Sequence, residues 1–524
     1  MNSFFNKNIR IINRYKIYRI FIFFPILIYL GKRSLIAYDE GIYALQAKWI
    51  LLNSDWVAPL WWGKISLDRT IGIQALIAFS QKIFGPSYFS IYIPNILASF
   101  LMLFFTYELH KEIFSNKYSL VSPIILSTTF LWFNYSHLAT QDMIFSALVT
   151  SALYASIKFL KNKKNIFSLI CGLWIGLAFM MKTYLTLIPL LAIIPLFIYG
   201  RIFFKKHFWI GLIVGFIPFS IWSYQIISNY DFLTYSGLYS KLIALSEKNN
   251  FTNPIYYYFW NFPLNIFPWS LFALLGLINA FKSKNFIQKY TLFFYPVIVI
   301  LLLSLFSTKT PYYPLQILSL ISLNSFRGLF NTFDNKNKFN RVITYLKFYF
   351  FPTVLLTLLL FININENKIS INSNDKLVIT LGLLLFSLGW LSTGLFKSNR
   401  SKIVFALAGP YLMTSIFVQS GKLSDRTKDL RLAAESLIER EALAGNKIEI
   451  VKKDINSTVA HSKIIKISLL MPSIGNGIKD IKDLKPNQYA WVTNLNIKLE
   501  NNNKVTTIDD SKIFSPWKLV LIEN

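Results

Sequence analysis

Residues 166–200 have the sequence IFSLICGLWIGLAFMMKTYLTLIPLLAIIPLFIYG, in which Lys182 is the only charged residue. A run of about 20 apolar residues is long enough for a helix to cross the hydrocarbon core of a bilayer. Lys182 and Thr183 divide this stretch into two such runs, over 166–181 and 184–200. The sequence therefore predicts two consecutive membrane-spanning helices with a charged residue between them.

Similar apolar runs recur along most of the chain. Hydrophobic residues make up 54% of the 524 residues and charged residues only 15%, whereas soluble domains carry about 25% charged residues. Thirteen spans are predicted, over residues 18–37, 91–108, 119–136, 142–160, 166–181, 184–200, 208–227, 263–281, 290–307, 311–328, 343–362, 376–396 and 403–419. The chain is predicted to be a mainly α-helical polytopic membrane protein. A disordered chain, a collagen-like chain and a cytosolic multidomain enzyme are excluded.

Basic residues are unevenly distributed among the loops between these spans. The chain has 54 Lys and Arg against 25 Asp and Glu, a formal net charge of +29. Basic clusters lie in every second loop, within residues 111–117, 158–164, 201–206, 282–289, 336–341 and 397–402. Cytoplasmic loops carry such an excess, so we expect a cytoplasmic N-terminus and, with an odd number of spans, an external C-terminus. Because these charges are confined to short loops, we expect no nucleic-acid partner.

Acidic residues follow the opposite distribution. Before residue 420, three of the twelve Asp and Glu lie in predicted cytoplasmic loops and nine in external segments or at their edges. The acids could simply avoid the cytoplasmic side, but acids contribute little to topology, and acids at a membrane edge are usually functional. We therefore expect a working site on the external face, beside the long external segments 38–90 and 228–262. Within 38–90, short interfacial helices are predicted over 43–52 and 73–84.

The composition changes after residue 420, which divides the chain into a membrane domain (1–420) and a polar domain (421–524). Strand-like runs cover 447–451, 464–470, 489–493 and 518–522, and helical spacing covers 425–443. These patterns predict a small extracytoplasmic α/β domain. One cysteine, Cys171, and four scattered histidines exclude a disulfide framework, a multi-cysteine zinc site and a histidine-rich metal cluster.

Three acidic positions are candidates for chemistry. Adjacent Asp39 and Glu40 follow the first span, and carboxylates there can hold a cation, position a hydroxyl or act as a base. Asp68 precedes Arg69, whose planar fork suits phosphate, although the two could form only a surface ion pair. Asp142 opens the fourth span, where it could instead only cap the helix dipole.

Two cations at the outer edges of spans oppose the general charge trend. Lys182 and Lys309 could snorkel to the interface, which is the ordinary role of such residues. Lys309 is more suggestive, because Pro311 and the aromatic pair Tyr312 and Tyr313 follow it. Cations, acids and aromatic residues beside lipid together suit a phosphate-linked lipid.

The motifs around these residues resemble those of a known family. They are YDEGIYA (38–44), NSDWVAP (53–59), GKISLDR (63–69), LATQDM (138–143), MKT (181–183) and STKTPYYP (307–314). In this order they resemble membrane glycosyltransferases of the GT-C fold, of the aminoarabinose transferase and protein O-mannosyltransferase type (glycosyltransferase family 39 and relatives).

The resemblance implies transfer of a sugar from a polyprenyl-phosphate donor to a lipid, glycan or protein acceptor at the outer face of a bacterial inner membrane. It implies that Asp39 is the catalytic aspartate, with Glu40 beside it, and that Asp142 is the second acid of the cleft. Contacts with the donor or acceptor are implied for Asp68, Arg69, Lys182, Lys241, Lys309, Tyr312 and Tyr313.

The expected reaction is a single displacement at the anomeric carbon, in which Arg69 and Lys309 stabilise the leaving phosphate. Asp39 would accept the proton of a hydroxyl acceptor. A divalent metal ion near these carboxylates stays open, without assigned ligands. Two other interpretations stay open as well: a transporter or flippase for a lipid-linked sugar, and a structural subunit that presents residues 421–524.

Overall fold

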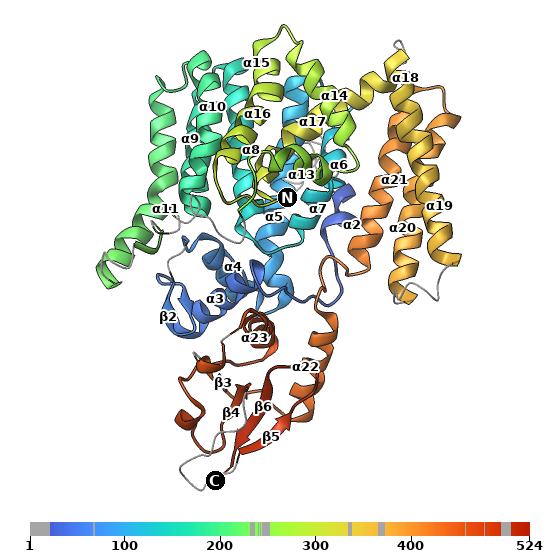
Figure 1. The fold of residues 1–524 in the computed structure, drawn as a ribbon. Helices are drawn as coiled ribbons and strands as arrows, with labels where there is room; N and C mark the ends of the chain where they lie inside the picture. Colours follow the sequence, from blue (N-terminus) through green and yellow to red (C-terminus); the bar gives the residue numbers. More distant parts are fainter. Residues whose placement is uncertain are drawn as a thin grey trace, which may run out of the picture.

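The computed structural model describes residues 21–66, 69–230, 236–238, 240, 243, 252–333, 338–364, 373–455, 457–475, 477–493 and 505–523. Helices form a bundle at one end of the molecule, and a small domain with a sheet lies at the other (Figure 1). Among the described residues, eight helices are long and apolar enough to cross a membrane, or nine if one bent pair counts as a span. A mainly helical polytopic protein is confirmed, whereas the number thirteen stays a prediction.

The bundle contains long and short helices. The longer ones are α5 (Tyr88–Ile113), α8 (Gln141–Asn162), α9 (Asn165–Lys182), α10 (Leu187–Gly200), α11 (Lys206–Tyr230), α14 (Ser270–Phe281), α16 (Tyr295–Leu305), α17 (Leu318–Phe333), α19 (Phe351–Ile364), α20 (Ser373–Leu391) and α21 (Asn399–Gln419). The shorter ones are α2 (Phe24–Leu27), α6 (Val121–Ser127), α7 (Phe130–Ser136), α13 (Tyr257–Asn265), α15 (Phe286–Lys289) and α18 (Lys338–Tyr345). Short 3-10 or π segments adjoin several of them: η2 (Thr183–Thr186), η4 (Tyr290–Phe294), η5 (Tyr313–Ile317), η6 (Leu346–Phe350) and η8 (Ser392–Leu395).

Helices α9 and α10, which the count of eight takes together as one stretch, are two separate helices, as the sequence predicts. The stretch Asn165–Gly200 has 36 residues. A straight helix of this length would measure about 54 Å, far more than the roughly 30 Å of a bilayer core. The chain reverses at η2, where Thr183 has a φ of 44°. Gly200 then packs directly on Leu160, close to the start of α9, so α10 returns to the end of the bundle from which α9 departs.

Four predicted spans differ in form from simple helices. The described part of the first one is helical only to Leu27 instead of residue 37. Span 119–136 consists of α6 and α7, with a break where Thr128 and Thr129 donate hydrogen bonds back to helix carbonyls. Span 263–281 is bent by 115° between α13 and α14, next to Pro268, which cannot continue a helix. Span 311–328 begins with η5 before α17.

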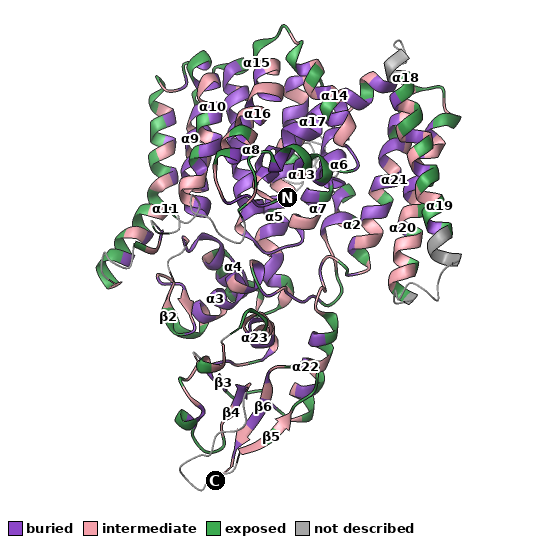
Figure 2. Ribbon diagram, viewed as in Figure 1, coloured by how far each residue is buried: buried purple, intermediate pink, exposed green. Residues whose placement is uncertain are grey.

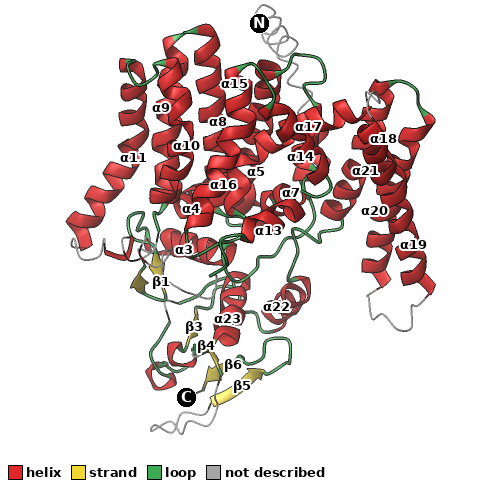
Figure 3. Ribbon diagram, turned by 45° about the horizontal axis from the view of Figure 1, so that its top comes forward, coloured by secondary structure: helices red, strands yellow, loops and turns green. Residues whose placement is uncertain are grey.

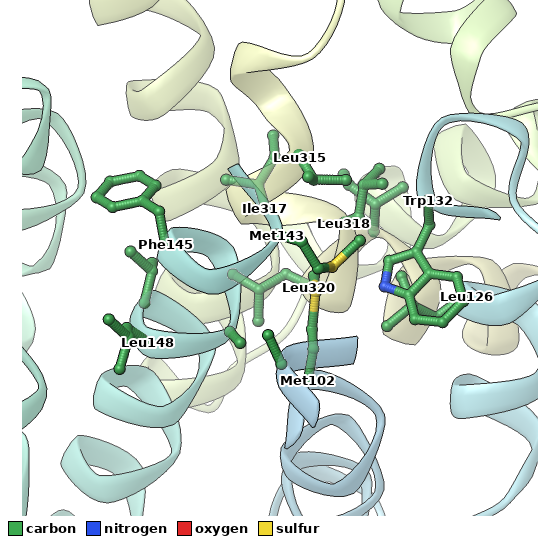
Figure 4. Close-up of a cluster of buried hydrophobic side chains, with 14 of the residues drawn as sticks. Met102, Leu126, Trp132, Met143, Phe145, Leu148, Leu315, Ile317, Leu318 and Leu320 are labelled. Atoms are coloured by element: carbon green, nitrogen blue, oxygen red, sulfur yellow. The ribbon is translucent and has the colours of Figure 1, made fainter. Parts of the chain in front are cut away.

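The core of the bundle lies between α8, α5, η5 and α17. Met143 of α8 lies among Leu315 of η5 and Leu318 and Leu320 of α17, and Met102 of α5 completes the cluster (Figure 4). All five side chains are buried. This packing fixes the start of α8 against η5, the two elements that carry Asp142 and Tyr313.

Exposed apolar side chains cover the outer helices. In α11 only 22% of the 18-residue apolar stretch is buried, and the side chains of Ile213, Ile217 and Ile221 are exposed along it. Figure 2 shows similarly exposed outer faces on α19 and α20. Such apolar surface is expected where lipid replaces water around a helix.

A layer of short elements lies between the bundle and the terminal domain (Figure 1). It contains α3 (Glu40–Asn53), the antiparallel pair β1 (Leu60–Trp61) and β2 (Lys64–Ile65), and α4 (Gly72–Phe84). The helices predicted over 43–52 and 73–84 are thereby confirmed.

The terminal domain packs helices α22 (Lys428–Arg440) and α23 (Thr458–Leu470) against one sheet (Figure 3). Its strands are β3 (Ile448–Ile450), β4 (Tyr489–Val492), β5 (Val505–Asp509) and β6 (Lys518–Ile522), in the order β3-β4-β6-β5. Strands β3 and β4 are parallel and the other pairs are antiparallel. The helix over 425–443 and three strands are confirmed, although the helix is shorter than predicted.

The prediction of a strand over 464–470 is wrong, because these residues belong to α23. A short apolar run suits a buried strand and a buried helix equally well. The N-cap favours the helix: the Ser457 hydroxyl accepts a hydrogen bond from the Ala460 N–H, so the helix begins upstream of the apolar run. Strand β5 was not predicted.

The terminal domain rests on α3. The Lys48 ammonium donates to the carbonyls of Ser468 and Met471 at 3.3 and 2.6 Å. Leu45 and Trp49, on the same helix, belong to the hydrophobic core of the terminal domain. The layer of short elements that contains α3 therefore lies between the bundle and the terminal domain and packs against the latter through α3.

Candidate active site

A cavity of about 130 Å³ brings together six separate segments of the chain. Its lining includes Asp39 and Tyr43, Arg69 and Thr70, Gln141 and Asp142, Met181 to Leu185, Leu238, and Tyr312 and Tyr313. It therefore lies where α3, the start of α8, the end of α9 and the start of η5 meet. Six residues predicted from the sequence line it: Asp39, Arg69, Asp142, Lys182, Tyr312 and Tyr313.

Asp39 stands directly before α3, in the N-cap position. Its φ of 55° and ψ of −98° are uncommon for a residue with a side chain. Thr183, in the same lining, also has a positive φ, of 44°. Strained backbone persists only where the surrounding structure enforces it, and it concentrates at functional sites. Two such residues in one cavity therefore support a functional role for this place.

Arg69 is held by an aromatic residue of α3. Its Nη1 donates a hydrogen bond of 2.5 Å to the Tyr43 hydroxyl, and its guanidinium lies 5.0 Å from the centre of the Tyr43 ring. A guanidinium fixed in this way keeps a planar fork for a carboxylate or phosphate.

Asp142 and Lys182 form a buried ion pair between the start of α8 and the end of α9. Their side chains are only 10% and 5% exposed. The Lys182 ammonium also lies 5.4 Å from the ring centre of Tyr312 and 5.2 Å from that of Tyr313. Lys182 is thus held in the cavity and does not snorkel into water.

Both tyrosines line the cavity, and a tyrosine hydroxyl can donate a hydrogen bond to a substrate oxygen.

Glu40 lies outside this lining, although the sequence paired it with Asp39 in catalysis. It is 1% exposed, and its carboxylate accepts hydrogen bonds from the N–H groups of Ile36 (2.9 Å) and Ala139 (3.1 Å). Burial raises the pKa of Glu40 from its ordinary 4.5 to about 7. This geometry suits a residue that positions the backbone.

Lys309 also lies outside the lining. Its ammonium donates to the backbone carbonyls of Asn253 (2.8 Å) and Phe306 (2.5 Å). The Asn253 side chain in turn donates to the Lys309 carbonyl at 3.0 Å. The structure therefore places Lys309 in a loop-fixing network, and Lys182 is the lysine beside the tyrosine pair. Asp68 and Lys241 lie outside the described residues, so their assignments stay predictions.

Sequence reasoning missed several lining residues. Tyr43 and Gln141 stand inside the motifs quoted above, four positions from Asp39 and one from Asp142. Because residues four apart share one face of a helix, the helical spacing around 43–52 could have identified Tyr43. No comparable motif or helical spacing in the sequence points to three other lining residues, Thr70, Tyr184 and Leu238.

Among the described residues, two carboxylates line the cavity, those of Asp39 and Asp142, and Asp142 is paired with Lys182. No group of three or more His, Cys, Asp or Glu suited to a metal ion occurs in the described parts of the chain. These oxygens could contribute to a Mg²⁺ or Mn²⁺ site only together with water or substrate phosphate.

Two small cavities lie on the bundle side of this one. A small cavity of about 10 Å³ shares Asp142, Lys182 and both tyrosines with it and also reaches Leu303 of α16. A further one of about 20 Å³ lies deeper along α8 and α10, between Leu148 and Ile193. Charged groups at the mouth and apolar walls behind them suit an amphiphilic substrate.

The chain is similar in sequence to several known proteins. Residues 68–224 match the family model of dolichyl-phosphate-mannose-protein mannosyltransferases. The chain is 27% identical over 303 residues to an undecaprenyl phosphate-alpha-4-amino-4-deoxy-L-arabinose arabinosyl transferase of Yersinia enterocolitica. That alignment covers 54% of this chain and about half (53%) of the relative. The Yersinia pestis protein of the same name is 26% identical over 415 residues, which cover 74% of this chain and 73% of that protein.

The fold is shared with a solved structure. ArnT from Cupriavidus metallidurans bound to undecaprenyl phosphate superposes with a TM-score of 0.76 at 12% identity, over 98% of this chain and 97% of that one. The chain therefore has the fold of ArnT from Cupriavidus metallidurans. In sequence it resembles arabinosyl transferases of Yersinia and, over residues 68–224, the mannosyltransferase family model.

Proposed function

We propose that the chain transfers a sugar from a polyprenyl-phosphate donor to an acceptor at the cavity between α3, α8, α9 and η5. The observation that carries this proposal is the cavity lining itself. It combines two cations, two carboxylates and a tyrosine pair, next to a small cavity that reaches apolar side chains of the bundle such as Ile188 and Leu303. The relatives from Yersinia are named for an undecaprenyl-phosphate-linked sugar, and ArnT from Cupriavidus metallidurans holds undecaprenyl phosphate.

The proposed reaction is a single displacement. An acceptor oxygen attacks the anomeric carbon, the bond from that carbon to the phosphate oxygen breaks, and polyprenyl phosphate leaves with the electron pair. If the acceptor is a hydroxyl, its proton passes to the Asp39 carboxylate. If the acceptor is itself a phosphate, no proton transfer is needed, and Asp39 orients the substrate.

Arg69 and Lys182 supply the positive charge in this scheme. Charge grows on the leaving phosphate in the transition state, so fixed cations there act selectively on the reaction rate. Arg69 is fixed by Tyr43, and Lys182 by Asp142 and the two tyrosines. Lys182 takes the place in the mechanism that the sequence alone suggested for Lys309.

The membrane orientation belongs to the same proposal. The cavity lies at the end of the bundle that faces the terminal domain (Figure 1). The basic segments 158–164 and 201–206 adjoin the opposite ends of α8 and α10. By the positive-inside rule those ends are cytoplasmic, so the cavity and the terminal domain face outward. Labelling of single cysteines placed at Lys163 and at Lys512 in intact cells tests this orientation, since only the second should react with an impermeant reagent.

The acceptor is a lipid, a glycan or a protein, and one experiment identifies it together with the sugar. Envelope lipids, glycans and proteins are compared by mass spectrometry in a deletion strain complemented with wild type, Asp39→Asn or Asp375→Asn. Asp375 is the matched control, because it lies outside the lining and pairs with Lys422. We expect one sugar-sized mass to return with wild type and Asp375→Asn but not with Asp39→Asn. Full restoration by Asp39→Asn, at equal protein level, would overturn the assignment.

A divalent metal ion bound by the donor phosphate and the cavity carboxylates remains a separate part of the proposal. Its test is transfer by purified protein from a synthetic polyprenyl-phosphate sugar in the presence of EDTA. Loss of activity that one metal restores supports the ion. Full activity in EDTA removes it from the mechanism without affecting the roles of Arg69 and Lys182.

A further inference from the structure

A second cavity, of about 310 Å³, lies at the other end of the bundle. It is formed by the end of α5, α15 and the end of α17, and its lining is Phe114, Ser115, Lys117, Tyr118, Gln288, Phe326, Arg327, Phe330 and Asn331. Helix α17 begins directly after η5, which carries Tyr313 of the catalytic cavity, and reaches this second cavity at its other end. The two cavities therefore lie at opposite ends of the bundle, and nothing in the proposed transfer reaction uses the second one.

Arg327 has an unmet hydrogen-bonding group in this cavity. Its Nη1 is buried and, among the described residues, has no hydrogen-bond partner. A buried donor of a charged group that lacks an acceptor costs free energy. Arg327 as a whole is partly exposed and lines the cavity, so a turn of its guanidinium would bring this nitrogen to an oxyanion there, which would also balance the charge.

The charge of the lining favours the same ligand. Lys117 is exposed at the rim, with its ammonium 5.3 Å from the Tyr118 ring centre, and none of the described residues in the lining is Asp or Glu. The two acids of α5 nearest this end are both engaged. Glu108 binds Lys111, and Glu112 is paired with lysines of α8. The described lining thus carries two positive charges and no negative one.

The other lining groups shape the cavity. Gln288 is satisfied, because its amide donates to the Ile113 carbonyl at 2.8 Å and accepts from the Ser283 hydroxyl at 3.3 Å. Phe114 and Phe326 contact each other in the wall, with ring centres 5.3 Å apart and ring planes tilted by 58°. Phe330 is 37% exposed at the opening. An apolar wall next to two cations suits a group that joins a phosphate to a hydrocarbon part.

We propose that this cavity binds a phosphate group, presented by the headgroup of an anionic lipid or as a free phosphate ion. Arg327 contacts the phosphate oxygens from within the cavity, and Lys117 contacts them from the rim. Basic cavities between membrane helices at the cytoplasmic side are typical places for anionic headgroups. The lipid source would explain the exposed Phe330, since acyl chains leave the cavity beside it.

The test uses the purified full-length protein in detergent, and native mass spectrometry measures binding of phosphatidylglycerol and of phosphatidylcholine. The variants are Arg327→Gln, Lys117→Gln and Arg400→Gln. Arg400 is the matched control, an exposed arginine outside the lining. Since each basic residue near a charged surface contributes about 1 kcal/mol, we expect roughly fivefold weaker phosphatidylglycerol binding in each of the first two variants. Arg400→Gln should bind like wild type.

Inorganic phosphate distinguishes the two sources. A phosphate-dependent rise in the unfolding temperature of wild type that Arg327→Gln lacks identifies the free ion as a ligand. Preference for phosphatidylglycerol without that rise identifies the headgroup. Equal phosphatidylglycerol binding by wild type, Arg327→Gln and Lys117→Gln, with no phosphate effect, overturns the proposal. Lys117 is exposed, so its variant tests the cavity even if Arg327→Gln folds poorly.

Discussion

The side chain of Glu40 holds the backbone of Ala139, 99 positions further along the chain, through a hydrogen bond of 3.1 Å. Glu40 follows Asp39, and Ala139 precedes Asp142 by three residues. The other carboxylate oxygen of Glu40 binds the Ile36 N–H. The two carboxylates of the catalytic cavity therefore stand on segments that one buried side chain connects.

Glu40→Ala should destabilise the protein and disorder the cavity, because it leaves two buried N–H groups without acceptors. The expected cost is about 1–3 kcal/mol for each unsatisfied group. Glu40→Gln keeps one acceptor oxygen and should retain more stability and more activity. Thermal unfolding in detergent and transfer rates per folded molecule measure both effects. If Glu40→Gln abolished transfer while leaving the unfolding temperature intact, Glu40 would have a direct role in the chemistry.

The stability of the wild type should fall between acidic and neutral pH because of Glu40. Burial raises the pKa of Glu40 to about 7, so in this range the folded protein keeps a proton that the unfolded chain releases. The contribution is fully present below about pH 4.5 and is lost as the pH rises through about 7. We expect the difference in unfolding temperature between wild type and Glu40→Gln to change from pH 5 to pH 8. A constant difference would contradict this assignment.

Breaking the Asp142–Lys182 pair should cost about 3–5 kcal/mol, because either single substitution leaves a buried charge without its partner. Asp142→Asn and Lys182→Met should each lower the unfolding temperature and the transfer rate. The double variant should recover part of the stability but none of the activity. A double-mutant cycle measures this coupling, and additive losses of stability would show that the two side chains do not interact.

Arg69→Ala should lower kcat about 10²- to 10³-fold with a smaller change in KM, as expected for a group that stabilises charge in the transition state. Tyr43→Phe keeps the ring beside the guanidinium but loses the hydrogen bond, so its loss should be smaller. Steady-state kinetics with a synthetic donor separate the two constants. An unchanged kcat in Arg69→Ala would remove Arg69 from the reaction.

Lys309→Met provides a contrast with Lys182→Met. Lys309 donates to two backbone carbonyls outside the cavity, so its loss should lower the unfolding temperature while kcat per folded molecule stays close to that of wild type. A selective loss of kcat without a loss of stability would instead favour the phosphate contact suggested by the sequence.

Much of this arrangement could be predicted from the order of residues. Long apolar runs locate the helices, and the motifs around Asp39, Arg69, Asp142 and Lys182 identify four residues that the fold brings into one cavity. These predictions succeed because hydropathy and local motifs act over short stretches. Tyr312 and Tyr313 were identified in the same way, from a helix break and its aromatic residues.

What the sequence did not disclose depends on contacts between distant segments. From the sequence alone, Glu40 and Lys309 resemble catalytic groups. In the fold, Glu40 binds the backbone N–H of Ala139, and Lys309 binds the backbone carbonyls of Asn253 and Phe306. The helix over Thr458–Leu470 depended on a cap upstream of the apolar run. The bend between α13 and α14 likewise arises where a predicted span contains Pro268.

The bonds from Lys48 to the carbonyls of Ser468 and Met471 have a consequence for engineering this protein. Trp49 and Leu45 supply apolar cover to a domain that begins several hundred positions later. A chain cut after Gln419 would therefore expose one face of α3, whose first turn adjoins Asp39. In chimeras between relatives, α3 and the terminal domain should be exchanged together, because they pack on each other although they lie far apart in the sequence.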